Sequence, residues 1–202
     1  MENTKQPLFL CLLVYCLVLH SYKVHSQSLE NFFHKGGKLY AANIEHVTSL
    51  KTDKDIAVYA IRLGYGSFLF NNFAIQGHLE LLKTKGYFKT KPNPSFETFD
   101  ANSFGIGTSF LFRWYAVKLG SVSFFVDASG GILYTFNSFP SKGTKLNFTA
   151  RPGTGIAVQI NNSQLLLSAN RFHLSNGQGY NHPHNPAYDG IGIFIGLIHR
   201  SK

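Results

Sequence analysis

A histidine, a serine and an aspartate near the end of the chain carry the functional groups of a hydrolytic triad. His173 and Ser175 are separated by one residue, and Asp189 follows fourteen residues after the serine. A serine hydroxyl becomes a nucleophile when an imidazole accepts its proton and a carboxylate orients that imidazole. The same three residue types also occur together by chance in polar girdles and loops. Residue types alone therefore leave a hydrolytic site and a structural girdle both open.

Alternation of side chains predicts that these three residues share one face of two neighbouring strands. In residues 163–174, His173 is in phase with Leu165 and Leu167, whereas the other face carries polar residues suited to an interior. Ser175 continues the face of His173. In residues 188–199, Asp189 is in phase with a run of isoleucines. We therefore expect the three polar groups at one end of an outward-facing apolar belt.

Apolar and polar residues alternate with a period of two along most of the chain. After residue 26 there is neither a sustained helical period nor an apolar run of about 20 residues, which a membrane-spanning helix needs. An even number of antiparallel strands is typical of single-chain outer-membrane barrels. The sequence thus predicts an all-β fold, an eight-stranded antiparallel transmembrane β-barrel of the outer membrane. The predicted strands are residues 38–47, 56–70, 73–84, 103–117, 122–136, 145–160, 163–174 and 188–199.

The predicted connections alternate between short and long, which supports a membrane barrel. Two-residue turns are expected at Asn71-Asn72, Leu119-Gly120 and Asn161-Asn162. The connections between them are long, polar and rich in Gly, Pro, Asn and Lys. Such barrels have short periplasmic turns and long extracellular loops. The strand that contains His173 then runs outward, and the three polar residues lie at the depth of the lipopolysaccharide headgroups. The long connections are residues 48–55, 85–102, 137–144 and 175–187.

Charged residues on the inward faces predict a filled interior. An eight-stranded barrel is just wide enough to be filled by its own side chains, which disfavours a small porin. Unpaired charges there would be costly, so we expect them to pair with one another. The inward charged residues are Arg62, Arg113, Arg151, Glu80 and Asp127.

Composition and the first residues agree with an exported membrane protein. Of 202 residues, 14% are charged and 15% are aromatic, and ordinary soluble domains contain about 25% charged residues. Residues 1–26 have a polar start, an apolar stretch of about 13 residues and a small-x-small site, which predicts a cleaved signal peptide. Residues 27–202 form the barrel domain and contain no cysteine. The net charge of +9 suits an anionic surface such as phosphorylated lipid.

Short motifs around the polar cluster are similar to those of a known family. Residues 171–176 (RFHLSN), followed by Asn185-Pro186 and Asp189, resemble the lipid A 3-O-deacylase family of outer-membrane barrels, whose pattern is His-x-Ser-Asn, a turn and an acidic residue. His-x-Ser-Asn alone is a weak pattern, and its place before the last strand makes it more specific. The resemblance covers roughly residue 103 to the C-terminus and includes residues 105–114, 140–148 and 153–155.

The resemblance implies an outer-membrane serine esterase that removes an ester-linked 3-hydroxyacyl chain from lipid A of lipopolysaccharide. It implies Ser175 as nucleophile, His173 as general base, Asp189 as the acid that orients His173, and Asn176 as part of the oxyanion hole. The chain departs from the family in having Asp where Glu is frequent. Its loop before Asp189 is about two residues longer, and residues 185–187 (NPA) replace the usual glycine turn.

Other functions receive less support from the sequence. His182 and His184 lack a nearby carboxylate cluster, so no metal and no cofactor is expected. Nucleic-acid binding has only the net charge in its favour, and the export signal argues against it. The expected partners are the lipid A substrate and outer-membrane lipids, and the oligomeric state stays open. The alternative function is that of a non-catalytic barrel acting in adhesion or membrane integrity.

Overall fold

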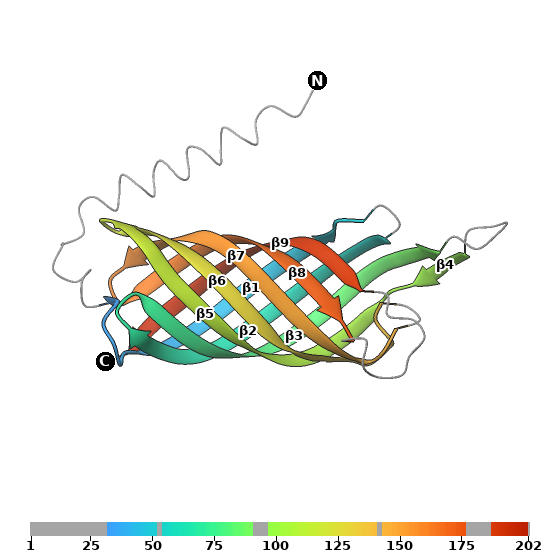
Figure 1. The fold of residues 1–202 in the computed structure, drawn as a ribbon, viewed down its shortest axis with the longest axis horizontal. Coiled ribbons are helices and arrows are strands. Elements are labelled where there is room, and N and C mark those ends of the chain that lie inside the picture. Colours follow the sequence, from blue (N-terminus) through green and yellow to red (C-terminus); the bar gives the residue numbers. More distant parts are fainter. Residues whose placement is uncertain (1–31, 52–53, 91–96, 141–142, 177–186, 202) are drawn as a thin grey trace, which may run out of the picture.

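The computed structural model describes residues 32–51, 54–90, 97–140, 143–176 and 187–201. Eight long antiparallel strands follow one another round a closed ring, and the last pairs with the first (Figure 1). The predicted eight-stranded β-barrel is therefore confirmed. Its strands are β1 (Lys38–Ser49), β2 (Lys54–Phe70), β3 (Phe73–Thr90), β5 (Ser103–Leu119), β6 (Val122–Thr135), β7 (Leu146–Ile160), β8 (Ser163–Ser175) and β9 (Tyr188–Ser201).

The segment predicted as a loop at residues 85–102 contains additional strand. β3 continues to Thr90, and the short strand β4 (Glu97–Asp100) pairs with β3 alone. This hairpin projects beyond the end of the ring (Figure 1). The side chains of residues 85–89 and 98–100 are exposed or half-buried on both faces. Only Phe88 packs, half-buried, against the second of the interior apolar clusters described below. Because so little of the hairpin meets a core, its sequence lacks a clear apolar and polar alternation and was wrongly assigned to a loop.

Tight turns close the end of the barrel at which the described chain begins and ends (Figure 1). Asn71-Asn72 and Asn161-Asn162 form turns as predicted, and Asn72 and Asn161 adopt φ values of 68° and 55°. Asparagine tolerates this left-handed conformation better than most residues. The third turn was predicted one residue too early. Leu119 still pairs with Val122, so the turn is 120–121, with Gly120 at φ 59°.

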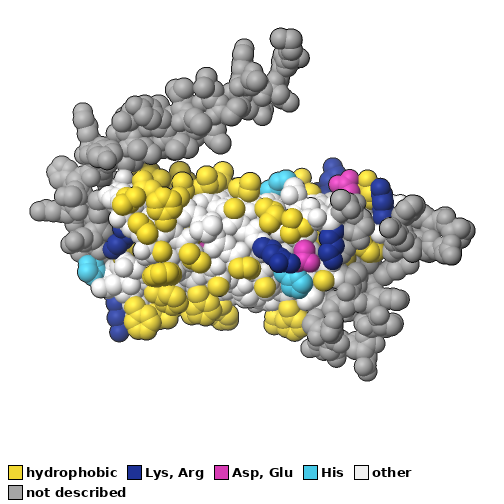
Figure 2. Space-filling model, turned by 45° about the horizontal axis from the view of Figure 1, so that its top comes forward, with side chains coloured by type: hydrophobic (Ala, Val, Ile, Leu, Met, Phe, Trp, Pro, Cys, Tyr) yellow, Lys and Arg dark blue, Asp and Glu magenta, His cyan; other side chains and the backbone are white. Residues whose placement is uncertain are grey.

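Side chains that alternate along each strand form a lipid-facing outer surface and a separate interior. Large apolar side chains on the outer wall are exposed, including Phe110 (63%), Trp114 (54%) and Ile193 (57%). Figure 2 shows hydrophobic side chains spread over the barrel wall. A surface of this kind needs a hydrocarbon environment, because soluble monomers rarely expose such large apolar areas.

Charged side chains in the interior pair with one another, as predicted. Arg113 donates two hydrogen bonds to Asp127 (2.8 and 2.6 Å), and Arg151 donates two to Glu80 (2.9 and 2.8 Å). Glu45, which is 1% exposed, was not among the predicted interior charges. Its carboxylate lies 3.6 Å from Arg62 and 3.4 Å from Arg151. The interior therefore balances three arginines against three carboxylates among these residues.

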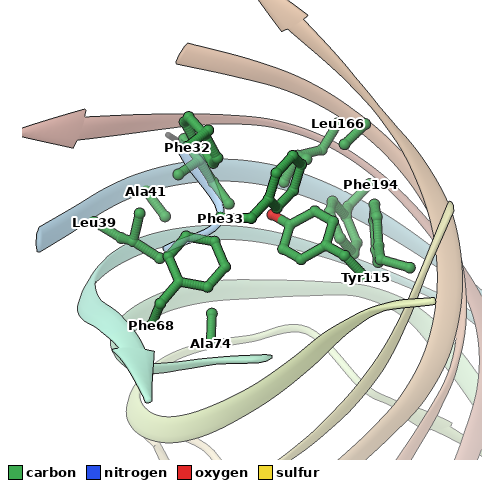
Figure 3. Close-up of a cluster of buried hydrophobic side chains, with 12 residues drawn as sticks. Phe32, Phe33, Leu39, Ala41, Phe68, Ala74, Tyr115, Leu166 and Phe194 are labelled. Atoms are coloured by element: carbon green, nitrogen blue, oxygen red, sulfur yellow. The ribbon is translucent and has the colours of Figure 1, made fainter. Parts of the chain in front are cut away.

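Apolar clusters fill the interior toward both ends of the barrel. At one end, Phe32 and Phe33 precede β1 and pack with Phe68 and Tyr115 (Figure 3). At the other end a second cluster includes Phe139, Phe172, Leu174 and Tyr188. These side chains and the ion pairs between them occupy the lumen, which agrees with the predicted absence of a wide channel.

Because neighbouring strands are staggered, the candidate site lies at the end of the barrel opposite the tight turns. Directly paired residues lead from Tyr40 on β1 through Phe110 on β5 to His173 on β8 and Asp189 on β9. From there the Leu50 N–H donates to the Asp189 carbonyl. One circuit of the ring thus climbs ten residues along β1, as the tilt of barrel strands requires. His173 and Asp189 consequently lie opposite the end that carries the tight turns.

The predicted signal peptide, residues 1–26, lies outside the described residues. The division into a signal peptide and a barrel from residue 27 therefore stays a prediction. Within the described ranges, no helix is both long enough and apolar enough to cross a membrane.

Candidate active site

The predicted general base and acid are in contact. His173 and Asp189 are directly opposite residues of β8 and β9, and Nδ1 of the imidazole lies 2.9 Å from Oδ1 of the carboxylate. A carboxylate only accepts hydrogen bonds, so Nδ1 carries the proton in this contact. In the neutral ring, Nε2 is then the unprotonated nitrogen and is free to accept a proton. The side chain of His173 is 40% exposed, whereas that of Asp189 is 12% exposed.

An arginine that sequence analysis did not assign to the site binds the same carboxylate oxygen. Nη2 of Arg171 lies 3.1 Å from Oδ1 of Asp189. Arg171 is two residues before His173 on β8, so both side chains lie on the outer face next to Asp189. The spacing of Arg171 and His173 was visible in the sequence. The diagonal position of Asp189 beside both of them depends on the register of β8 and β9.

Ser175 is the last residue of β8 and follows His173 on the same face. It is partly exposed and lies opposite Phe148 of β7. Residues two apart along a strand are separated by about 7 Å. Among the described residues, the serine hydroxyl has no hydrogen bond to His173. Catalytic hydrogen bonds in free enzymes are often long and tighten only when substrate binds.

Asn176 directly follows the serine and is only 3% exposed. Its side chain therefore does not lie on the open surface that Ser175 shares with His173. The backbone N–H group after a nucleophilic serine is a common oxyanion donor in hydrolases. Asn176 can contribute to an oxyanion hole through this backbone group, whatever its side chain binds.

The interior side chains behind the site hold the ends of β8 and β9 in place. Phe172 and Leu174, which flank His173 in the sequence, are fully buried, as is Tyr188 before Asp189. The rings of Phe172 and Tyr188 lie 5.9 Å apart. The Tyr188 hydroxyl donates to the backbone carbonyl of Ile56 on β2 (3.1 Å). These contacts fix the backbone on which His173 and Asp189 stand.

The polar site faces the surroundings of the barrel and not its lumen. Ile191 of β9 is 43% exposed beside Arg171, and Phe148 of β7 is 39% exposed beside Ser175. An acylated substrate in the membrane can therefore approach along the wall without entering the barrel. This arrangement suits an ester whose acyl chain stays in hydrocarbon while its carbonyl meets polar groups.

The possible metal ligands noted in the sequence, His182 and His184, lie outside the described residues, as does the Asn185-Pro186 turn. Among the described residues, no group of three His, Cys, Asp or Glu side chains is arranged to hold a metal ion.

Comparisons with known proteins agree with the resemblance seen in the sequence. The family model for lipid A 3-O-deacylase (PagL) matches residues 60–197, which is more than half of the chain. The crystal structure of the outer membrane enzyme PagL is similar in fold, with a TM-score of 0.54 at 15% identity, covering 77% of this chain and 97% of that chain. The solid-state NMR structure of the outer membrane protein AlkL in DMPC bilayers matches with a TM-score of 0.38 at 9% identity, covering 84% of this chain and 92% of that chain. No curated protein sequence matches.

Proposed function

The chain belongs to the lipid A 3-O-deacylase family of outer-membrane hydrolases, and we propose that it hydrolyses the ester through a triad of Ser175, His173 and Asp189. The observation that carries this proposal is the contact between His173 Nδ1 and Asp189 Oδ1 at 2.9 Å, with Ser175 two residues after His173 on the same face of β8. The substrate is lipid A, from which the enzyme removes an ester-linked 3-hydroxyacyl chain.

In the first half of the reaction, Ser175 Oγ attacks the ester carbonyl while His173 Nε2 accepts the hydroxyl proton. Asp189 holds the imidazole in the required tautomer and stabilises the imidazolium that forms. The negative charge on the carbonyl oxygen is held by the Asn176 backbone N–H and neighbouring amides. Removal of one such donor typically costs about 3 kcal/mol of transition-state stabilisation. The intermediate collapses, the sugar oxygen leaves, and His173 returns the proton to it.

In the second half, a water molecule attacks the carbonyl of the ester that the acyl chain now forms with Ser175. His173 again accepts a proton, now from the water, and returns it to Ser175 Oγ as the tetrahedral intermediate collapses and the bond between the acyl carbon and this oxygen breaks. The free 3-hydroxy fatty acid and the deacylated lipid A are the products. All protons are exchanged through His173, so the site needs no cofactor for this sequence.

Asp in place of the longer Glu is compatible with this chemistry. Because His173 and Asp189 are directly opposite, the shorter side chain already reaches the imidazole. Arg171 supplies a second donor to the same carboxylate oxygen, at 3.1 Å. Two donors restrict the rotation of a short carboxylate more than one donor does, which supports Asp189 as the orienting acid.

The lipid A of cells that express the chain tests this function against that of a non-catalytic barrel. We expect mass spectrometry to show lipid A lacking the mass of one hydroxyacyl chain, with the corresponding free hydroxy acid. Matched cells without the chain should keep the full mass. An unchanged lipid A profile, with the barrel folded in the outer membrane, would instead support a role in adhesion or membrane integrity.

A further inference from the structure

A hollow of about 1100 Å³ lies on the outer wall, formed mainly by outward side chains of β9, β1, β2, β3 and β5. We propose that this hollow is a second lipid site, which binds a phosphorylated and acylated lipid, namely a lipid A molecule other than the one being deacylated. The proposal rests on the outer-membrane location of the barrel and on the chemistry of this wall; only the count of two lipids in its test also rests on the proposed function of the triad.

The row of the hollow that lies nearer the loop end of the barrel, here called the upper row, offers polar groups suited to a phosphate. His46, Tyr59, Lys83 and Phe104 are directly paired across four neighbouring strands, and all four side chains are exposed. The His46 ring stacks on that of Tyr59 at 4.9 Å, and Lys83 Nζ lies 5.1 Å from the centre of the Phe104 ring. Among the described residues, no carboxylate is paired with Lys83. A fixed cation, an imidazole and a phenol hydroxyl thus face outward together.

The lower row of the hollow is purely aliphatic. Ile44, Ile61, Leu81 and Ile106 are directly paired in the same way, two residues further from the loop end of each strand. Their exposed fractions are 68%, 51%, 56% and 44%. Polar donors above and a continuous aliphatic surface below match a lipid that carries an anionic headgroup and acyl chains.

The depth of Lys83 in the membrane agrees with a headgroup contact. Ile193 lies four residues below Asp189 on β9, which is about 10 Å for strands tilted by roughly 40°. The row from Ile193 through His46 and Tyr59 to Lys83 crosses three strand intervals and climbs about 9 Å. Lys83 is therefore almost level with Asp189. An outward lysine is tolerated near the membrane interface but costly at the bilayer midplane.

The position around the ring indicates a second lipid molecule. Lys83 lies three strands from Asp189 in a ring of eight, more than a third of the circumference. The wall curves away over that distance, so a headgroup placed over His173 and Asp189 faces a different direction. Lipid A is the occupant that this leaflet supplies with phosphates and several acyl chains, and its negative charge complements Lys83.

Native mass spectrometry of the full barrel in detergent, with bisphosphorylated lipid A as the probe, tests this proposal. The Ser175→Ala background prevents turnover, so bound lipids can be counted. We expect two lipid A molecules per barrel. Lys83→Gln should weaken the second by about tenfold, the effect of losing one charged hydrogen bond, whereas Lys83→Arg should retain it. Lipid A without phosphates should bind at this position with the same affinity to the parent barrel and to the Lys83→Gln variant.

Lys38→Gln is the matched control, because Lys38 is also exposed on a strand but lies at the opposite end of the barrel. It should leave both lipids bound. With Ser175 intact, Lys83→Gln should hydrolyse lipid A at the parent rate under saturating substrate. A single lipid on the Ser175→Ala barrel that Lys83→Gln does not weaken, or equal retention of the second lipid by the Lys83→Gln and Lys38→Gln variants, would overturn the proposal while leaving the triad unaffected.

Discussion

Replacement of Ser175 by alanine is expected to lower the rate of hydroxyacyl release by three orders of magnitude or more while leaving the barrel folded. The variant removes one oxygen at the partly exposed end of β8, so the free energy of unfolding should change by less than about 1 kcal/mol. The remaining rate would depend on substrate binding and the oxyanion donors alone. The measurement compares initial rates on purified lipid A in detergent, with heat-modifiable gel mobility as the check on folding.

Variants of the two partner residues provide the controls for this result. His173→Ala should cost about as much as Ser175→Ala, because members of one catalytic unit are not additive. Asp189→Ala should cost less, since the carboxylate only orients the base, and Asp189→Glu should keep most of the activity. A folded Ser175→Ala barrel that releases hydroxy acid at the parent rate would show that the nucleophile is another residue.

Replacement of Asp127 by leucine is expected to destabilise the barrel by about 3–5 kcal/mol, because it leaves an arginine charge unpaired in the interior. The Arg113 side chain is 1% exposed, and Asp127 accepts both of the hydrogen bonds that it makes to a carboxylate. The guanidinium also lies 4.0 Å from the centre of the Phe125 ring. Urea unfolding in lipid vesicles measures the loss.

The matched control replaces both partners with apolar residues of similar volume. Arg113→Met combined with Asp127→Leu removes the charge as well as its partner, so most of the lost stability should return. If the single and double variants are equally destabilised, the loss reflects packing around Asp127 and not an unpaired charge. If Asp127→Leu alone costs nothing, the interior arginine reaches water, and the filled lumen is wrong.

Much of the fold was predictable because a barrel wall has two chemically different faces. Successive side chains of a strand point to opposite faces, so the face of Arg113, Asp127 and His173 follows from the neighbouring apolar residues. Prediction failed where this contrast is absent. The hairpin of β3 and β4 projects beyond the ring, and its sequence does not alternate. Glu45 was not placed in the lumen, although it completes the charge balance there.

The candidate site was predictable in its residue types but not in its contacts. The order of Arg171, His173 and Ser175 gives their common face, because all three are on one strand. Which residue of β9 lies opposite His173 depends on the register, and the loop between β8 and β9 does not fix it from the sequence. The structure sets Asp189 opposite His173, and this register also brings Arg171 to the carboxylate.

Covalent labelling of the nucleophile tests the central claim most directly. The intact barrel in detergent is treated with an alkyl fluorophosphonate, which reacts with activated serine hydroxyls, and the modified residue is located by peptide mass spectrometry. We expect one adduct, on Ser175, whose formation is lost in His173→Ala and is suppressed by lipid A. An adduct on a different residue, or labelling of Ser175 that is equally fast without His173, would contradict the account.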